Sequence, residues 1–98
     1  MWAQLIKTRV KPGKEEELRN LPQEFEAQGG TPPFVHIFTC NNQNDPSEYY
    51  TFVVFESQEA ARSNEASPEQ AQRIERMQDL YEGQPEYVDL NVEFQRSR

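Results

Sequence analysis

The stretch Tyr49-Tyr50-Thr51-Phe52-Val53-Val54-Phe55, written YYTFVVF, decides the fold because it is apolar on both sides. A strand with one wet face alternates apolar and polar residues. Here Phe52 and Val54 project to one side, whereas Val53 and Phe55 project to the other. The stretch therefore predicts a central strand whose two faces both need cover.

The segments around this strand carry the periodicities of three more strands and two helical regions. Strands are expected over residues 2–10, 34–41 and 87–94, and a turn over 42–47 makes the second and third strands a hairpin. One helix is expected over 14–28. A second helical region has two pieces, a short helix over 58–64 and one from Ser67-Pro68 to Gly83.

Local signals set the ends of these helices. Ser57 and Ser67 are placed as N-caps, and Gln70 completes a capping box after Ser67. Pro22 conflicts with the first helix because proline lacks the amide that bonds to the carbonyl four residues earlier. A kink, or two short helical pieces, is therefore expected there.

The resulting order, β-α-β-β-α-β, predicts an α+β, ferredoxin-like domain over residues 1–98. Right-handed crossovers place strands 2–10 and 49–55 in the middle of an antiparallel sheet, with both helices on one face. No further element remains for the other face, so a second copy of the chain is the expected cover, in a dimeric α/β barrel. The alternative is an aromatic face that stays partly exposed.

The composition of the chain excludes some classes of binding partner and indicates a cellular compartment. The 98 residues hold 17 acidic and 10 basic side chains, a net charge of −7, which argues against nucleic acid and anionic membranes. The single cysteine, Cys40, fits a reducing compartment, and neither a signal peptide nor a membrane span is visible. A cytoplasmic location is therefore expected.

The chain shows no familiar catalytic signature. A glycine-rich phosphate loop, zinc-ligand spacing and a nucleophile elbow are all missing, so we expect neither a metal nor another cofactor. His36 is the one side chain whose chemistry stands out, because an imidazole among aromatics can act as a general base. The plainer reading is a histidine that only satisfies a hydrogen bond.

With these landmarks the chain resembles the antibiotic biosynthesis monooxygenase domain family. The resemblance rests on Val10-Lys11-Pro12-Gly13-Lys14-Glu15-Glu16-Glu17-Leu18, on Asn44-Asp45-Pro46, on Phe55-Glu56-Ser57-Gln58-Glu59-Ala60-Ala61 and on Ser67-Pro68. It implies a dimeric α/β barrel whose substrate cleft lies between the helices and the sheet. The family includes oxygenases that need no cofactor and members without known activity, so fold alone does not fix the function.

The resemblance and the pattern together predict a cleft under the helices. We expect it to be formed by the even-numbered face of strand 2–10 and the apolar face of strand 87–94, while Lys7 and Arg9 pair with Asp89 and Glu93 on the other side. Its candidate lining is Trp2, Gln4, Phe34, Phe38, Phe52, Asn64 and Met77, with His36 as the candidate catalytic base.

Three functions remain open at this point. The first is an oxygenase or isomerase that acts on an aromatic or enolisable small molecule, and among these we favour a monooxygenase of a phenol or quinol. The second is a module that binds an apolar small molecule without turnover. The third is a dimerisation domain that has no ligand.

Overall fold

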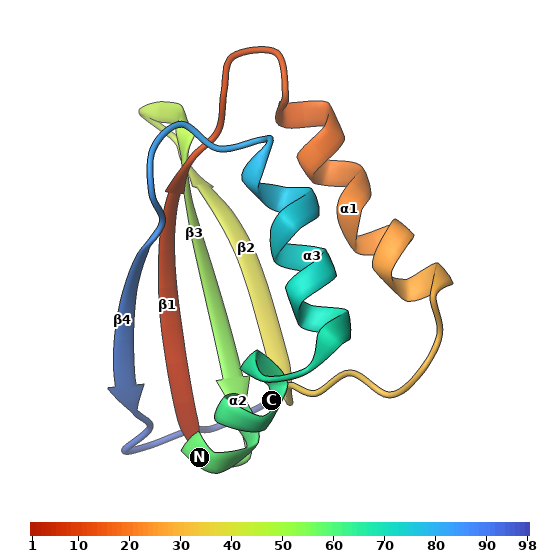
Figure 1. Ribbon diagram of the computed structural model, residues 1–98. Helices are drawn as coiled ribbons and strands as arrows, with labels where there is room; N and C mark the ends of the chain where they lie inside the picture. Colours follow the sequence, from red (N-terminus) through yellow and green to blue (C-terminus); the bar gives the residue numbers. More distant parts are fainter.

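The computed structural model describes all of residues 1–98. Its elements are β1 (Trp2–Arg9), α1 (Glu15–Ala27), β2 (His36–Asn42), β3 (Asp45–Phe55), α2 (Gln58–Glu65), α3 (Pro68–Gln78) and β4 (Glu86–Asn91). The strands pair antiparallel in the order β2-β3-β1-β4, with β3 and β1 in the middle. The helices lie on one side of this sheet (Figure 1), so the ferredoxin-like prediction is confirmed.

Both predicted serine caps form. Ser57 Oγ accepts from the Ala60 amide at 3.1 Å, and Ser67 Oγ accepts from the Gln70 amide at 3.2 Å. Each hydroxyl satisfies an amide that the first helical turn leaves free, which explains why α2 and α3 begin where they do.

Of the two alternatives expected at Pro22, the two short helical pieces do not form. Residues Glu15–Ala27 form one helix that contains Pro22 in its interior. Pro22 is exposed, so water can donate to the Leu18 carbonyl that the proline ring leaves without its helical partner. Leu21, one residue earlier, is 2% exposed and anchors α1 to the domain.

The β2–β3 hairpin is tighter than expected. The turn was predicted over 42–47, but Asn42 pairs with Asp45 and only residues 43 and 44 lie between the strands. Asn42 Oδ1 accepts from the Asn44 amide at 2.9 Å, a local bond that closes the turn. β2 also begins at His36 rather than at residue 34, which frees Phe34 from the alternation of the strand.

The last helix and the last strand both end earlier than the sequence predicted. α3 ends at Gln78 rather than at Gly83, because the chain there turns to the end of β1. Tyr81 forms a bridge with Val10, and the Glu82 amide donates to the Arg9 carbonyl at 2.7 Å. β4 then ends at Asn91 instead of residue 94.

The register fixes which side chains share a face. Trp2 pairs with Phe55 and Asn91, whereas the next residue, Ala3, pairs with Val54 and Leu90. Trp2 and Phe55 belong to the core under the helices, so Ala3, Val54 and Leu90 lie on the opposite side, which we call the open face.

The prediction that the apolar face of β4 lies under the helices is therefore wrong. The helix side of β4 carries Asp89 and Tyr87, the partners of Gln4 and Ile6. Its apolar residues, Val88 and Leu90, belong to the open face. Each strand was read correctly by itself, but periodicity does not say which of two faces a neighbouring strand turns to the core.

The core reaches both ends of the sheet, because Val10 and Leu80 are fully buried where β1 ends and an aromatic cluster lies where β1 begins. Trp2, Val53, Phe55 and Ala61 form this cluster, with the Trp2 and Phe55 ring centroids 6.1 Å apart and tilted by 45°. This tilted geometry is favourable for aromatic pairs. None of the three helices is both long and apolar enough to span a bilayer.

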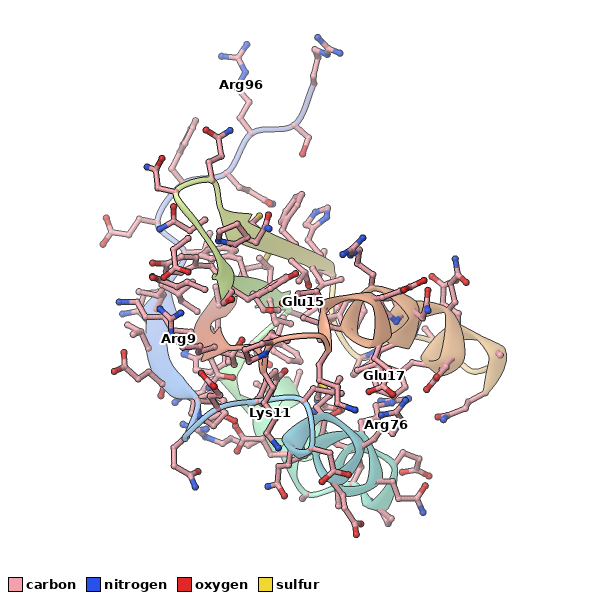
Figure 2. All side chains as sticks on the ribbon, turned by 90° about the horizontal axis from the view of Figure 1, so that it is seen from above. Arg9, Lys11, Glu15, Glu17, Arg76 and Arg96 are labelled. Atoms are coloured by element: carbon pink, nitrogen blue, oxygen red, sulfur yellow. The ribbon has the colours of Figure 1, made fainter.

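Charged residues tie the far end of the sheet together. Arg9 donates to both carboxylate oxygens of Asp45, at 2.7 and 3.4 Å, and lies 3.7 Å from Glu48. Between the helices, Arg76 reaches from α3 toward α1 and donates to Glu24 at 3.5 Å (Figure 2). The expected pairing of Lys7 and Arg9 with Asp89 and Glu93 is not found, because Asp89 faces the helix side.

The Arg9–Asp45 pair predicts a specific acid sensitivity. The hydrogen bond from Arg9 holds the pKa of Asp45 below its usual value. Such a carboxylate stabilises the fold above its unfolded pKa, and this contribution is lost as the pH falls through the lower folded pKa. We expect Asp45→Asn to lower the free energy of unfolding at pH 7, by an amount that shrinks below about pH 4.

Urea titrations between pH 7 and pH 2 measure this difference. Glu93→Gln is the control, because Glu93 is an exposed carboxylate with no ion pair, and it should match the parent throughout. A deficit of Asp45→Asn that stays the same at pH 2 would contradict the assignment.

Candidate functional site

The candidate site lies on the helix side of the sheet, at the end where β2 begins. Figure 1 shows that the segment entering β2 and the α2–α3 connection reach this same end. Phe34 packs here against the core cluster of Trp2 and Phe55 and is itself half-buried. We call the group of Trp2, Phe34, Ile37 and Asn64 the helix-side site.

Ile37 shows that the helices leave part of the sheet uncovered. It pairs with Val53, which is 7% exposed in the core, and therefore points to the helix side. Ile37 nevertheless stays 46% exposed, and its neighbour Val35 is 43% exposed. Ile37 of β2 thus leaves an accessible apolar strip on the helix side of the sheet, and apolar contacts of this kind line most small-molecule sites.

Asn64 carries a free amide on the core-facing side of α2. It lies three residues after Ala61, so both side chains share one face of α2, and Ala61 is part of the core. The Asn64 carbonyl accepts from Ser67 Oγ at 2.8 Å, but its side-chain amide bonds to no protein group. That amide can donate to, or accept from, a ligand oxygen.

Gln4 lies on the same side of the sheet, but its amide is already engaged. Gln4 Nε2 donates to Asp89 Oδ1 at 3.1 Å, and Arg62 Nη2 lies 3.5 Å from Asp89 Oδ2. The Arg62 guanidinium carbon also lies 5.6 Å from the centre of the Trp2 ring. This network fixes α2 to the β4 edge and leaves Gln4 Oε1 as the only free polar atom of that amide.

Met77 lies on α3 and contacts Tyr81, whose hydroxyl donates to the Met77 sulfur at 3.6 Å. Burial raises the pKa of the Tyr81 phenol, and the nearby Tyr87 adds to this shift. A hollow of about 210 Å³ opens beside Tyr81 between Gln78 and Pro85. This feature belongs to the α3–β4 connection, so the structure does not bring Met77 to the helix-side site.

Three of the predicted site residues lie on the other side of the sheet. His36 pairs with Val54, and Phe38 pairs with Phe52, all on the open face. The His36 and Phe38 rings are stacked, with centroids 6.5 Å apart. The prediction that His36, Phe38 and Phe52 line one cleft with Trp2 and Asn64 is therefore wrong, because the sheet itself separates them.

The reason lies in the start of β2. Phe34 was expected on the face of His36, Phe38 and Cys40, but it precedes the strand and turns to the core instead. A catalytic role for His36 remains a prediction. It requires that the reacting atoms lie on the open face.

The open face is apolar over two rows that cross all four strands. The first row is His36, Val54, Ala3 and Leu90, and the second is Phe38, Phe52, Leu5 and Val88. Phe38 is 59% exposed in the single chain. The C-terminal tail borders a hollow of about 430 Å³ on this face, and Arg96 marks its course away from the helices (Figure 2).

Arg73 is a further polar residue near the helix layer that the sequence did not single out. Its guanidinium carbon lies 5.7 Å from the centre of the Phe25 ring on α1. Its Nε is buried and has no hydrogen-bond partner. The structure brings together no cluster of three or more histidine, cysteine or acidic side chains that could hold a metal ion.

The fold has close structural relatives. A cofactor-independent oxygenase from Streptomyces nogalater, SnoaB, is 14% identical, with 96% of this chain and 94% of that chain covered and a TM-score of 0.77. Rv0793 from Mycobacterium tuberculosis is 16% identical over 98% of both chains, with a TM-score of 0.74. A conserved protein from Methanosarcina mazei is 13% identical over 92% of this chain and 91% of that one, with a TM-score of 0.76.

These identities establish a shared fold and nothing finer. No curated protein matches the chain in sequence. Residues 1–76, however, match the family described as antibiotic biosynthesis monooxygenase, and this segment holds β1 to β3, α2 and most of α3. The resemblance seen in the sequence is thereby confirmed, and the chain belongs to the antibiotic biosynthesis monooxygenase family.

Proposed function

We propose that the protein is a cofactor-independent monooxygenase that acts on a phenol- or quinol-type aromatic molecule bound at the helix-side site. The observation that carries the proposal is the accessible strip at Ile37 on the helix side of the sheet, the side to which the aromatic core of Trp2 and Phe55 also belongs. Family membership and the fold shared with SnoaB support an oxygenase. The substrate class follows from the lining, which offers flat apolar contacts and few polar anchors.

The proposed oxidation by O₂ requires the protein only to bind the substrate and to stabilise its negative charge. An ionised phenol donates an electron to oxygen far more readily than the neutral form does. In an anthrone, the ring CH₂ group then becomes a carbonyl: two C–H bonds break, one atom of O₂ stays on carbon and the other leaves as water. The substrate supplies all four electrons, so the equation balances without a reductant.

A non-catalytic binding module is the second candidate. The observation in its favour is that the helix-side site contains no imidazole, since the only histidine of the chain is on the open face. In that case the same strip and amide would hold an apolar molecule without converting it.

Oxygen uptake separates the two candidates. We expect the purified protein to consume oxygen with at least one member of a panel of anthrones and hydroquinones, with no cofactor added. Heat-inactivated protein sets the background rate of autoxidation. Thermal stabilisation by panel members without any uptake above background would instead support the binding module, because a ligand of the native state must stabilise it.

A pair of alanine variants tests on which side of the sheet the reaction occurs. Asn64→Ala should lower kcat/KM by about tenfold or more, because a hydrogen bond to a developing charge is lost. His36→Ala should leave the rate within about twofold, since the sheet lies between His36 and the bound substrate. A fall of 10²- to 10⁴-fold in His36→Ala, the effect of a removed general base, would place the reaction on the open face.

We also propose that two copies of the chain pack their open faces together. Phe38, Phe52 and Val88 of these rows stay exposed in the single chain, although Ala3 and Val54 are buried, and exposed apolar patches of this kind mark interaction sites. A second copy supplies a matching face through a two-fold axis. Such an interface resembles a domain core cut in half, which is typical of obligate dimers.

Light scattering at micromolar concentration should give twice the chain mass of 11.5 kDa. Phe38→Glu should produce a folded monomer, because it places a charge in the second apolar row. Ile37→Glu is a matched control, since it is the adjacent residue, is similarly exposed and points to the other side. A monomeric parent, or a dimeric Phe38→Glu, would refute the proposed interface.

A further inference from the structure

Arg73 is the one half-buried arginine without a carboxylate partner, since Arg19, Arg96 and Arg98, which also lack one, are exposed. The 17 acidic side chains outnumber the 10 basic ones. Arg9, Arg62 and Arg76 each form an ion pair with an acidic residue. Arg73 is half-buried, and it forms neither an ion pair nor a hydrogen bond with the protein.

The Arg73 side chain does not pair with the nearest suitable carboxylate on its own helix. Glu69 lies four residues before Arg73 on α3, the spacing and order that favour an ion pair on a helix. Instead the Arg73 guanidinium lies against Phe25 of α1, with its carbon 5.7 Å from the ring centre. Arg76, three residues after Arg73, pairs with Glu24, the residue next to Phe25. Of these two arginines, only Arg73 therefore has no acidic partner.

The position of Phe25 shows on which face of α1 the Arg73 guanidinium lies. Phe25 lies four residues after Leu21, which is 2% exposed, so the two side chains share the inner face of α1. The buried Nε of Arg73 is the only buried side-chain polar atom of the protein without a hydrogen-bond partner. The terminal Nη atoms of Arg73 are not enclosed in this way and also have no partner in the protein, so a ligand oxygen can accept from them.

We propose that Arg73 is a binding residue for an acidic oxygen of the ligand, either a carboxylate or an ionised phenol. This inference deepens the proposed function, on which it rests for the location of the ligand. A planar guanidinium with several donors matches such an oxygen, and charge-assisted hydrogen bonds are the stronger kind. Phe25 holds the guanidinium from one side by a cation–π contact and leaves its edge for the ligand.

For a phenol, the same contact promotes ionisation. The O–H bond breaks so that the electron pair stays on oxygen, and the proton passes to water. The guanidinium gives up no proton in this step, because arginine stays charged in proteins. Its positive charge stabilises the phenolate, so no imidazole is needed on this side of the sheet.

The test compares two probes of the same shape, 2-naphthoate and 2-naphthamide, by calorimetric titration at pH 7 without oxygen. The parent protein should bind the carboxylate about tenfold or more tightly than the neutral amide. Arg73→Met keeps an unbranched apolar stem without the charge, and it should abolish this preference while naphthamide binding and the thermal midpoint are retained. Arg73→Lys should restore part of the preference, because it returns the charge without the planar fork.

Arg76→Met is the matched control on the same helix, since that charge is already paired, and it should keep the full preference. The proposal is overturned if the parent does not prefer naphthoate, or if Arg73→Met prefers it as strongly as the parent does. Because the titration involves no turnover, a retained preference without oxygen uptake would reject the oxygenase and leave the anion site intact.

Discussion

The structure depends on one constraint: the sheet is apolar on both faces, but the chain has helices for only one of them. β3 states this most clearly, because Val53 and Phe55 enter the core while Phe52 and Val54 face away from it. Burial of apolar area drives folding and association alike. The helix layer therefore covers one face of the sheet, and the open face keeps exposed apolar side chains such as Phe38 and Val88.

The same constraint separates two kinds of chemistry. Side chains that alternate along β2 fall on opposite sides, so Ile37 joins the helix-side site while His36 and Phe38 join the open face. A ligand on one side cannot touch groups on the other. The imidazole therefore lies on the open face, whereas the free amide of Asn64 belongs to the helix side of the sheet.

The architecture could be predicted from the sequence because the strong local signals agree with one another. The caps at Ser57 and Ser67, the hairpin turn and the two-sided strand at 49–55 all indicate the observed topology. The faces of β4 could not be predicted. Its alternation is clear, but a shift of one residue in register exchanges the faces, and only the pairing of Leu90 with Ala3 shows which face is used.

The site was harder to predict for the same reason. Phe34 was placed by extending the alternation of β2 past its true start, which wrongly grouped it with His36. Arg73 was overlooked because an arginine on a helix is ordinarily a solvated charge. Its significance comes from contacts between α3 and α1, where Phe25 replaces the nearby Glu69 as its neighbour. In so acidic a chain, a half-buried guanidinium without a carboxylate is a local positive charge, and the proposed binding of an acidic ligand oxygen depends on it.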